Sequence, residues 1–198
     1  MTIFAGGLSY LAPRYGFVCD NVALFEVVLA SGEITQAYPA VKDPLIPGMN
    51  EDLFQALKGG SNNFGIVTRI DYKTLSMGKM WGGQIVYNIS QAPTALRAFA
   101  DFTAATPYDE YATTIQSVAY VEGFGLVGVN DFEYTKEIAN PPAFAGWDGI
   151  QPRLTSSLRI ANLKDITDEQ GSFSPDGMRY VVNYGECRRG SPNRDRVC

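Results

Sequence analysis

The sequence predicts an α+β protein built from antiparallel strand pairs and a few helices. An apolar run over 22–30 turns at Ser31 and Gly32 and returns over 33–37. Two runs rich in β-branched and aromatic residues, 111–121 and 124–132, meet at Glu122 and Gly123. Between these pairs, apolar residues at helical spacing over 51–57 give way to a strand pattern.

The first element expected is a β-hairpin from Val22 to Ala37. Its first half is a nearly continuous apolar run, which is typical of a strand covered on both faces. Ser31 and Gly32 suit the tight turn between the two strands. Residues 38–49 contain three prolines and are expected to form a surface loop.

A helix, a turn and a strand are expected over EDLFQALKGGSNNFGIVTR, residues 51–69. The Asn50 side chain is expected to cap the helix by accepting a backbone N–H bond. Gly59 and Gly60 are expected to end it, because glycine takes a positive φ without strain. The strand pattern that follows is carried by Phe64, Ile66, Val67 and Ile70. The glycine pair has two interpretations: backbone that approaches a ligand closely, or a helix packed tightly on a sheet.

The composition shifts after a linker expected at 76–80. Residues 84–89 alternate like a strand, and Ser90 is expected to cap a helix with Pro93 in its first turn. The paired strands 111–121 and 124–132 follow. The remaining elements expected are a short helix over Lys136 to Pro142, a strand over Gln151 to Ile160 and a helical turn over Ile166 to Gln170.

Composition excludes several classes of function. The chain is 45% apolar and 19% charged, as in soluble globular proteins. Its net charge of -5 gives no reason to expect nucleic acid or an anionic membrane as partner. No apolar run reaches about 18 residues, so no transmembrane helix is expected. Met1 is not followed by the charged start and apolar core of a secretory signal, and neither a compartment nor an oligomeric state follows from the sequence.

The absence of histidine narrows the chemistry further. It excludes a Ser-His-Asp triad, a Cys-His dyad and metal sites built on histidine. Cys19, Cys187 and Cys198 lack the spacing of metal ligands, so no metal site is predicted. Cys19 is expected to be a small buried residue.

Three linked motifs carry a family resemblance: GGLSYLAPRYGFVCDNV, VVLASGEI and EDLFQALKGGSNNFGIVTR. Their order and spacing over about residues 5–75 resemble the PCMH-type FAD-binding domain of the vanillyl-alcohol oxidase superfamily. Within it, the berberine-bridge-enzyme-like branch is the most similar. The resemblance implies the second half of an FAD-binding domain over 1–77 and the first part of an antiparallel-sheet substrate domain over 78–177. The arginine-rich segment 178–198 departs from the family and is expected to be disordered. The chain is expected to be truncated at both ends.

The resemblance also implies a cofactor site. Glycines let backbone N–H groups approach phosphate oxygens, so the tail of the glycine-rich loop is expected to lie against the FAD diphosphate. Without histidine there is no histidyl link, so FAD would be held non-covalently. Arg14 is expected to be a solvated surface residue, with a phosphate contact as the alternative. The FAD-binding residues implied are Gly6, Gly7, Leu8, Ser9, Asn21, Gly65, Ile66 and Val67.

The family passes hydride from a small organic substrate (an alcohol, sugar or amine) to FAD, usually with O2 as the final acceptor. The protein supplies position and electrostatics for this transfer. A base must take the substrate proton. Conceivable bases are Tyr87, Tyr120, Glu122 and Tyr134, but packing or surface roles are expected for each, so no catalytic residue is predicted. The alternative to an oxidoreductase is an inactive remnant or interaction fragment that no longer binds FAD, and the isolated chain is expected to be inactive.

Overall fold

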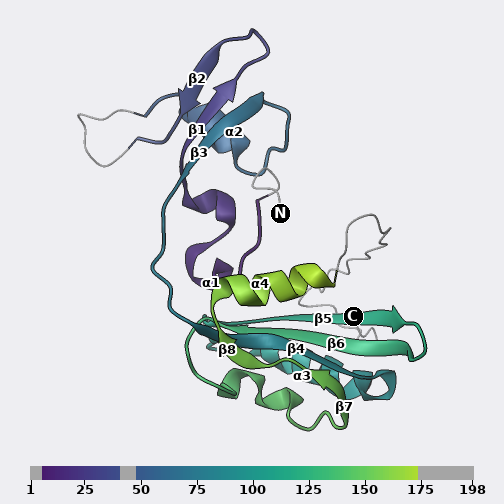
Figure 1. Cartoon of the computed structure of the whole chain (residues 1–198). Coiled ribbons are helices and arrows are strands. Elements are labelled where there is room, and N and C mark those ends of the chain that lie inside the picture. The colour runs from purple at the N-terminus through teal and green to yellow at the C-terminus, as the bar shows by residue number, and fades with distance from the viewer. Residues whose placement is uncertain (1–5, 41–47, 174–198) are drawn as a thin grey trace, which may run out of the picture.

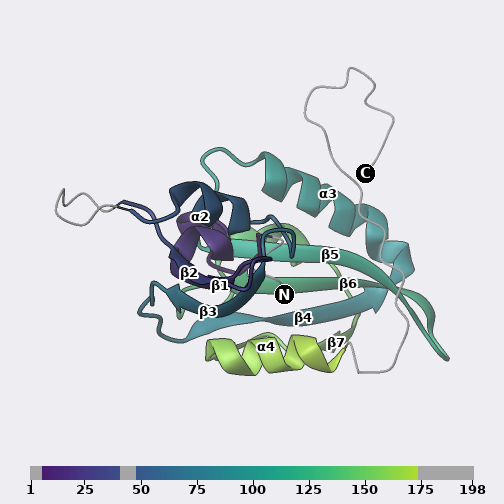
Figure 2. The ribbon, with the colours of Figure 1, turned by 90° about the horizontal axis from the view of Figure 1, so that it is seen from above.

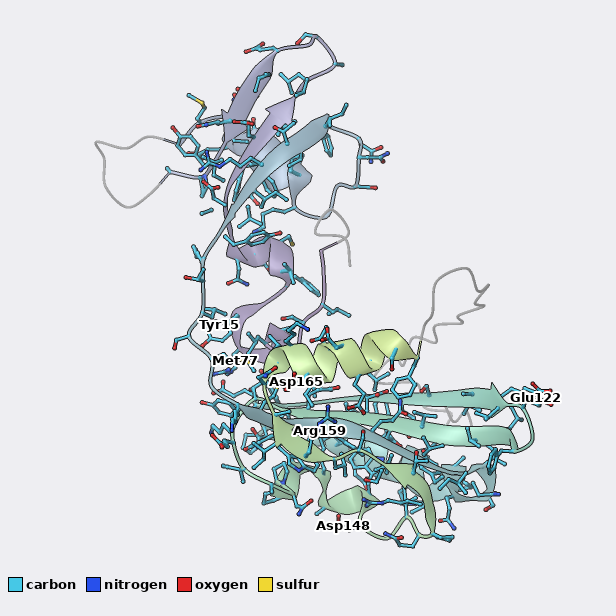
Figure 3. All side chains as sticks on the ribbon, in the orientation of Figure 1. Tyr15, Met77, Glu122, Asp148, Arg159 and Asp165 are labelled. Carbon is cyan, nitrogen blue, oxygen red and sulfur yellow. The ribbon has the colours of Figure 1, made fainter. Side chains whose placement is uncertain are left out.

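The computed structural model of this chain describes residues 6–40 and 48–173. They form two antiparallel sheets, a small one with the strand order β2-β1-β3 and a larger one with the order β5-β6-β4-β7. The small sheet stands above the larger one, with α1 and α4 between them (Figure 1). Tyr15 and Met77 lie in the region that joins the two sheets (Figure 3). No helix of these described ranges is both long and apolar enough to cross a membrane.

The small sheet contains the predicted hairpin. β1 (Val22–Val28) pairs antiparallel with β2 (Ile34–Ala37) and with β3 (Ile66–Tyr72). Gly32 takes a φ of 83° in the turn, which only glycine adopts without strain. α2 (Glu51–Leu57) buries Phe54 and Leu57 against Phe25 and Val27 of β1. The apolar residues that sequence spacing assigned to one helix face therefore form the core of this part.

Three details of this region differ from expectation. The Asn50 side chain makes no cap hydrogen bond, because Asn50 is in the left-handed region (φ 50°) and its amide donates to Thr35 Oγ1 and the Gln36 carbonyl. α2 ends at Leu57, and of the two glycines only Gly59 has a positive φ, of 86°. β3 begins at Ile66, so Phe64 precedes the strand.

The larger sheet is built on β4 (Met80–Asn88) and β6 (Gly125–Tyr134), which lie in its centre. β5 (Ala112–Val121) forms the predicted hairpin with β6, while β7 (Arg153–Ser156) and β8 (Arg159–Ala161) both pair with β4. α3 (Ala92–Ala104) and the 3₁₀ helix η4 (Pro142–Trp147) cover one face. An aromatic core fills the space beneath them, with Trp81, Tyr87, Phe132, Phe144 and Trp147 all buried.

The other face of this sheet is covered by α4 (Leu163–Ser172), which buries Ile166 against Met80 and Ala161. Tyr10 and Met77 pack at the edge of this small cluster. Seen from above, α4 runs along the β4 side of the sheet (Figure 2). This face meets the N-terminal segment, and it carries the polar residues described below.

Several boundaries in this half were wrong. No helix spans Lys136 to Pro142, and the 3₁₀ helix η4 begins only at Pro142. Ser90 does not cap α3; it lies in the 3₁₀ helix η3 (Ile89–Gln91), and its backbone N–H is bound by the Asn88 side chain. The strand expected over 151–160 is two short strands, β7 and β8.

Residues 73–79 between the sheets contain no helix or strand. The domain division at 77 stays a prediction. The segment 178–198 lies outside the described residues, so its expected disorder also stays a prediction.

Candidate functional site

The glycine-rich segment is held in place by its own backbone. Gly6 and Gly7 have φ values of 91° and 79°, which a side chain would disfavour. Their carbonyls accept 2.9 Å hydrogen bonds from the N–H groups of Cys19 and Val18 in the 3₁₀ helix η2 (Val18–Asn21). The segment therefore doubles back on η2, with the four-residue helix α1 (Ala12–Tyr15) at the bend. Cys19 is buried there, as expected.

Arg14 contacts the larger sheet and so holds this bend against it. Its guanidinium lies over the Tyr111 ring, 4.5 Å from the ring centre, and over the Tyr15 ring at 4.9 Å. Its Nη2 also donates to Thr135 Oγ1 at 3.5 Å. Arg14 is half-buried, so the expectation of a solvated surface arginine was wrong. Tyr111 and Thr135 come from far along the chain, so local sequence does not reveal these two contacts.

An open cavity of about 790 Å³ lies between this segment, the sheet and α4. One wall is the segment 8–13, and another is formed by residues 113–115 of β5 with Glu133 of β6. Leu163, Thr167 and Gln170 of α4 complete it. Most of the lining is apolar, and it includes no lysine or arginine. This arrangement suits a flat, largely apolar group that presents a polar edge to the sheet.

Glu133 is the acidic group of the cavity wall, and only 1% of its surface is exposed. Its Oε1 accepts a 2.9 Å hydrogen bond from Gln170 Nε2, and its Oε2 accepts from Thr113 Oγ1 at 3.3 Å. Burial, and secondarily the charge of Asp131, raise the pKa of Glu133 to about 8. The carboxyl can therefore take or give a proton near neutral pH.

Two further ionisable groups share this environment. Asp131 is 8% exposed, burial raises its pKa, and Gln84 Nε2 donates to its Oδ1 at 3.2 Å. Tyr10 donates from its hydroxyl to Gln170 Oε1 at 2.7 Å. Burial, and then the charges of Glu133 and Asp131, raise the pKa of Tyr10 to about 12. Tyr10, Gln170, Glu133 and Thr113 thus form one continuous hydrogen-bonded chain across the cavity wall.

Apart from Gly6 and Gly7, described above, the predicted FAD-binding residues divide into three groups in space. Leu8 and Ser9 line the large cavity. Ser9 also lines a neighbouring hollow of about 330 Å³ together with Asn21, whose amide donates to the carbonyls of Tyr15 and Phe17. Gly65, Ile66 and Val67 line neither space; Ile66 and Val67 pair with Val28 and Val27 on β1. All these assignments to FAD stay predictions.

None of the four conceivable bases lines the cavity. Tyr87 is buried in the aromatic core and donates to Asn130 Oδ1 at 2.8 Å, and Tyr134 donates to Asp109 Oδ2. Tyr120 is exposed, and Glu122 lies at the tip of the β5–β6 hairpin (Figure 3). The sequence prediction ended this strand at Phe132 and so missed Glu133. The alternation Asp131-Phe132-Glu133-Tyr134 was the available indication, because it continues the strand period by two residues.

Comparison with curated proteins gives relatives that share most of this chain. The FAD-dependent monooxygenase elcE of Phaeosphaeria nodorum is 42% identical over 197 residues, which cover 90% of this chain and 56% of that protein. The FAD-dependent monooxygenase FUP4 of Fusarium proliferatum is 33% identical over 184 residues, 89% of this chain and 34% of its own length. The oligopeptidase PhomG' of Diaporthe leptostromiformis is 41% identical over 179 residues, which make up 14% of that protein. No family model matches the chain.

Solved structures with the same fold include a VAO-type flavoprotein. The 6-hydroxy-D-nicotine oxidase of Arthrobacter nicotinovorans aligns over 88% of this chain and 37% of its own, with a TM-score of 0.69 and 18% identity. The VAO-type flavoprotein MtVAO615 of Myceliophthora thermophila aligns over 81% of this chain and 29% of its own, with a TM-score of 0.56 and 24% identity. This chain is similar in sequence to FAD-dependent monooxygenases and shares the fold of VAO-type flavoproteins. Its fold is the corresponding part of a VAO-type flavoprotein, with mixed helices and antiparallel sheets.

The cavity can be tested for its fit to the cofactor of VAO-type proteins. The left-handed glycines leave the backbone of the segment free of side chains where it begins to approach the cavity. Leu8 presents an exposed aliphatic surface (71% exposed) that suits contact with a flat ring. Thr113, Glu133 and Gln170 supply polar groups on the opposite wall. These residues fit a flavin ring between the segment and the sheet.

Proposed function

We propose that this chain forms one part of an FAD-dependent oxidoreductase site. In this site a small organic substrate of the alcohol, sugar or amine type gives hydride to FAD, with O2 as the final acceptor. The observation that carries the proposal is the cavity between residues 8–13, of which Leu8 and Ser9 were predicted to bind FAD, and the sheet that bears Glu133. The names of two relatives, FAD-dependent monooxygenases, support FAD as the cofactor and O2 as a reactant. The chain spans 14% to 56% of the lengths of the curated relatives described above.

The protein groups have separable roles in this proposal. Bound flavin supplies the chemistry of hydride acceptance. A flavin ring bound over Leu8, Leu11 and Ile115 would displace water from these apolar walls, which would strengthen polar interactions within the cavity. The hydrogen-bonded wall formed by Thr113, Glu133 and Gln170 orients the substrate. FAD would form no covalent link to a histidine of this chain, because the chain contains no histidine.

A second candidate is a chain that keeps this fold without holding FAD. One observation favours it: Gly65, Ile66 and Val67, predicted to bind FAD, line neither of the spaces that Leu8, Ser9 and Asn21 line. A cofactor bound by only some of its contacts loses most of its affinity, because the remaining contacts no longer fix its orientation.

The visible absorption spectrum of the purified chain, before and after addition of FAD and desalting, separates the two candidates. Retention of the flavin band supports the first candidate, and a colourless protein supports the second. Leu8→Glu places a charge on the cavity wall and is expected to abolish retention. Ile34→Glu is the matched control, because Ile34 is similarly exposed (67%) but lies on β2, outside the cavity lining. Equal loss in both variants would show that retention does not depend on this cavity.

A further inference from the structure

The charge of the large cavity has only one sign. Glu133 is an acid in its wall, and Asp131 lies two residues away on the same strand. No ion pair reaches either carboxylate within the described residues. Arg159 lies on β8, which β4 separates from the strand of Glu133; it sits beneath α4 (Figure 3) and is paired with Glu169. Wherever Glu133 or Asp131 is ionised, an anionic ligand would therefore meet like charge without a counter-ion.

Glu133 keeps hydrogen-bonding capacity for a ligand. Each oxygen of a carboxylate can accept two hydrogen bonds, and each Glu133 oxygen accepts one from protein, from Gln170 or from Thr113. Both partners are neutral donors, so neither neutralises the charge. The remaining acceptor positions suit an O–H or N–H group of a molecule in the cavity.

Gln170 holds the carboxylate in a fixed orientation. The Tyr10 hydroxyl donates to Gln170 Oε1, so the amide must direct its Nε2 donor to the opposite side, toward Glu133. Tyr10 belongs to the segment assigned to FAD, and Gln170 to α4. The carboxylate is thus held by elements on both sides of the cavity.

We propose that Glu133 is the catalytic proton acceptor of this site, and that the site takes neutral or cationic substrates with a hydroxyl or amine group and excludes carboxylates. This inference rests on the proposed function. With flavin bound as the hydride acceptor, the O–H or N–H bond of the substrate would break with its proton going to Glu133, and the adjacent C–H bond would break with its electron pair leaving as hydride. A C=O or C=N bond forms, so the substrate is oxidised and flavin is reduced.

The groups that face Glu133 set the pH at which it works. They are Thr113 from β5, Asp131 from its own strand, Gln170 from α4 and Tyr10 from the glycine-rich segment. Glu169 of α4 acts on Asp131 and is itself paired with Arg159. Ionised Glu133 is the proton-accepting form, so the reaction is expected to accelerate as pH rises through the pKa of Glu133. A bound O–H or N–H donor stabilises the ionised form and therefore lowers this pKa.

The test is a titration of the chain carrying ¹³C at the glutamate side-chain carboxyl, with the Glu133 resonance assigned by its loss in Glu133→Gln. Benzyl alcohol, benzylamine and benzoate are added in turn to the chain with FAD. We expect the alcohol and the amine to shift the Glu133 resonance and lower its pKa, and benzoate to bind at least about tenfold more weakly. Glu122→Gln, at the exposed hairpin tip, is the control and leaves these responses unchanged.

Two results would overturn the inference: benzoate binding as tightly as the alcohol, or a Glu133 resonance that does not respond to either donor. FAD retention, read from the absorption of the same sample, tests the proposed function separately. If FAD is retained and Glu133 does not respond, only the inference fails. If FAD is not retained, the proposed function fails, and the titration of the flavin-free chain still decides whether Glu133 selects neutral donors. If the FAD-bound chain oxidises substrate, Glu133→Gln is expected to lower the rate of oxidation by about 10²- to 10⁴-fold.

Discussion

The guanidinium carbon of Arg14 lies 4.5 Å from the centre of the Tyr111 ring, and this contact joins the glycine-rich segment to the larger sheet. Lys136 lies over the same ring, with its Nζ 3.3 Å from the centre. The placement of the segment beside the cavity therefore depends on a cation–aromatic contact between Arg14 and Tyr111, which are 97 positions apart in sequence (111 − 14).

Replacement of Arg14 by alanine is expected to loosen the segment. Partly buried cation–aromatic contacts are worth about 1–2 kcal/mol, so the free energy of unfolding should fall by about that amount. Amide hydrogen exchange over residues 8–15 should accelerate more than exchange in the sheets. Arg97→Ala, on the exposed face of α3, is the control. Unchanged exchange over 8–15 in Arg14→Ala would contradict the role of this contact.

The buried Glu133 carboxyl predicts a pH-dependent stability. Its pKa is about 8 in the folded chain against an ordinary value of 4.5, so folding favours the protonated form. Its contribution to stability is fully present below pH 4.5 and is lost as the pH rises through about 8. The upper bound of this loss is about 5 kcal/mol.

Glu133→Gln removes the titration while keeping a neutral group of similar shape. The variant should therefore lose less stability than the parent chain between these two pH values, measured by urea unfolding at a series of pH values. Glu122→Gln changes the net charge equally at an exposed site and corrects for general charge effects. Parallel stability curves for parent and Glu133→Gln would show that Glu133 does not titrate in this range.

Gly128 is expected to be intolerant of any side chain. A Cβ atom there would lie 2.1 Å from Cε2 of the Tyr87 ring, so the ring would have to move and its hydrogen bond to Asn130 would be strained. We expect Gly128→Ala to destabilise the chain by about 1–3 kcal/mol in thermal or urea unfolding. Gly149→Ala is the control, since a Cβ at Gly149 meets nothing within 4 Å. Similar losses in both would rule out the Tyr87 contact as the cause.

Gly7 tests the backbone conformation of the segment. Its φ of 79° disfavours side chains, so Gly7→Ala should cost about 1–2 kcal/mol in the free energy of unfolding. Gly78→Ala, in the connection between the sheets, has open space around it and no left-handed φ, and should be nearly neutral. A neutral Gly7→Ala would mean that the segment adopts another backbone path in solution.

Local patterns predicted most of the strands. The hairpin over 22–37 and the β5–β6 hairpin are determined by alternation and turn residues close together in sequence, and both form. The predicted helix at Lys136 to Pro142 was wrong: residues 136–141 contain no helix. The Asn50 cap failed because its amide binds β2 across the fold rather than its own helix.

The site was harder to predict than the fold. An acid such as Glu133 in an alternating strand normally faces water, and here it is buried because α4 and the segment around Tyr10 cover that face. The bond between Tyr10 and Gln170 joins residues 160 positions apart. No local sequence pattern predicts this hydrogen bond or the burial of Glu133 that accompanies it. Leu8 and Ser9 were assigned to FAD from motif likeness rather than from periodicity, and this assignment stays a prediction.

The end of β6 places Phe132 in the aromatic core and Glu133 in the cavity wall on the opposite face. A slip of this strand by one residue would exchange the two faces, pressing carboxylates against Trp147 and Phe144 and leaving aromatic rings in the cavity. Such a misaligned sheet would bury charges without partners, so it would be strongly disfavoured. Asp131 and Glu133 thus also favour the correct register of β6 over the shifted one.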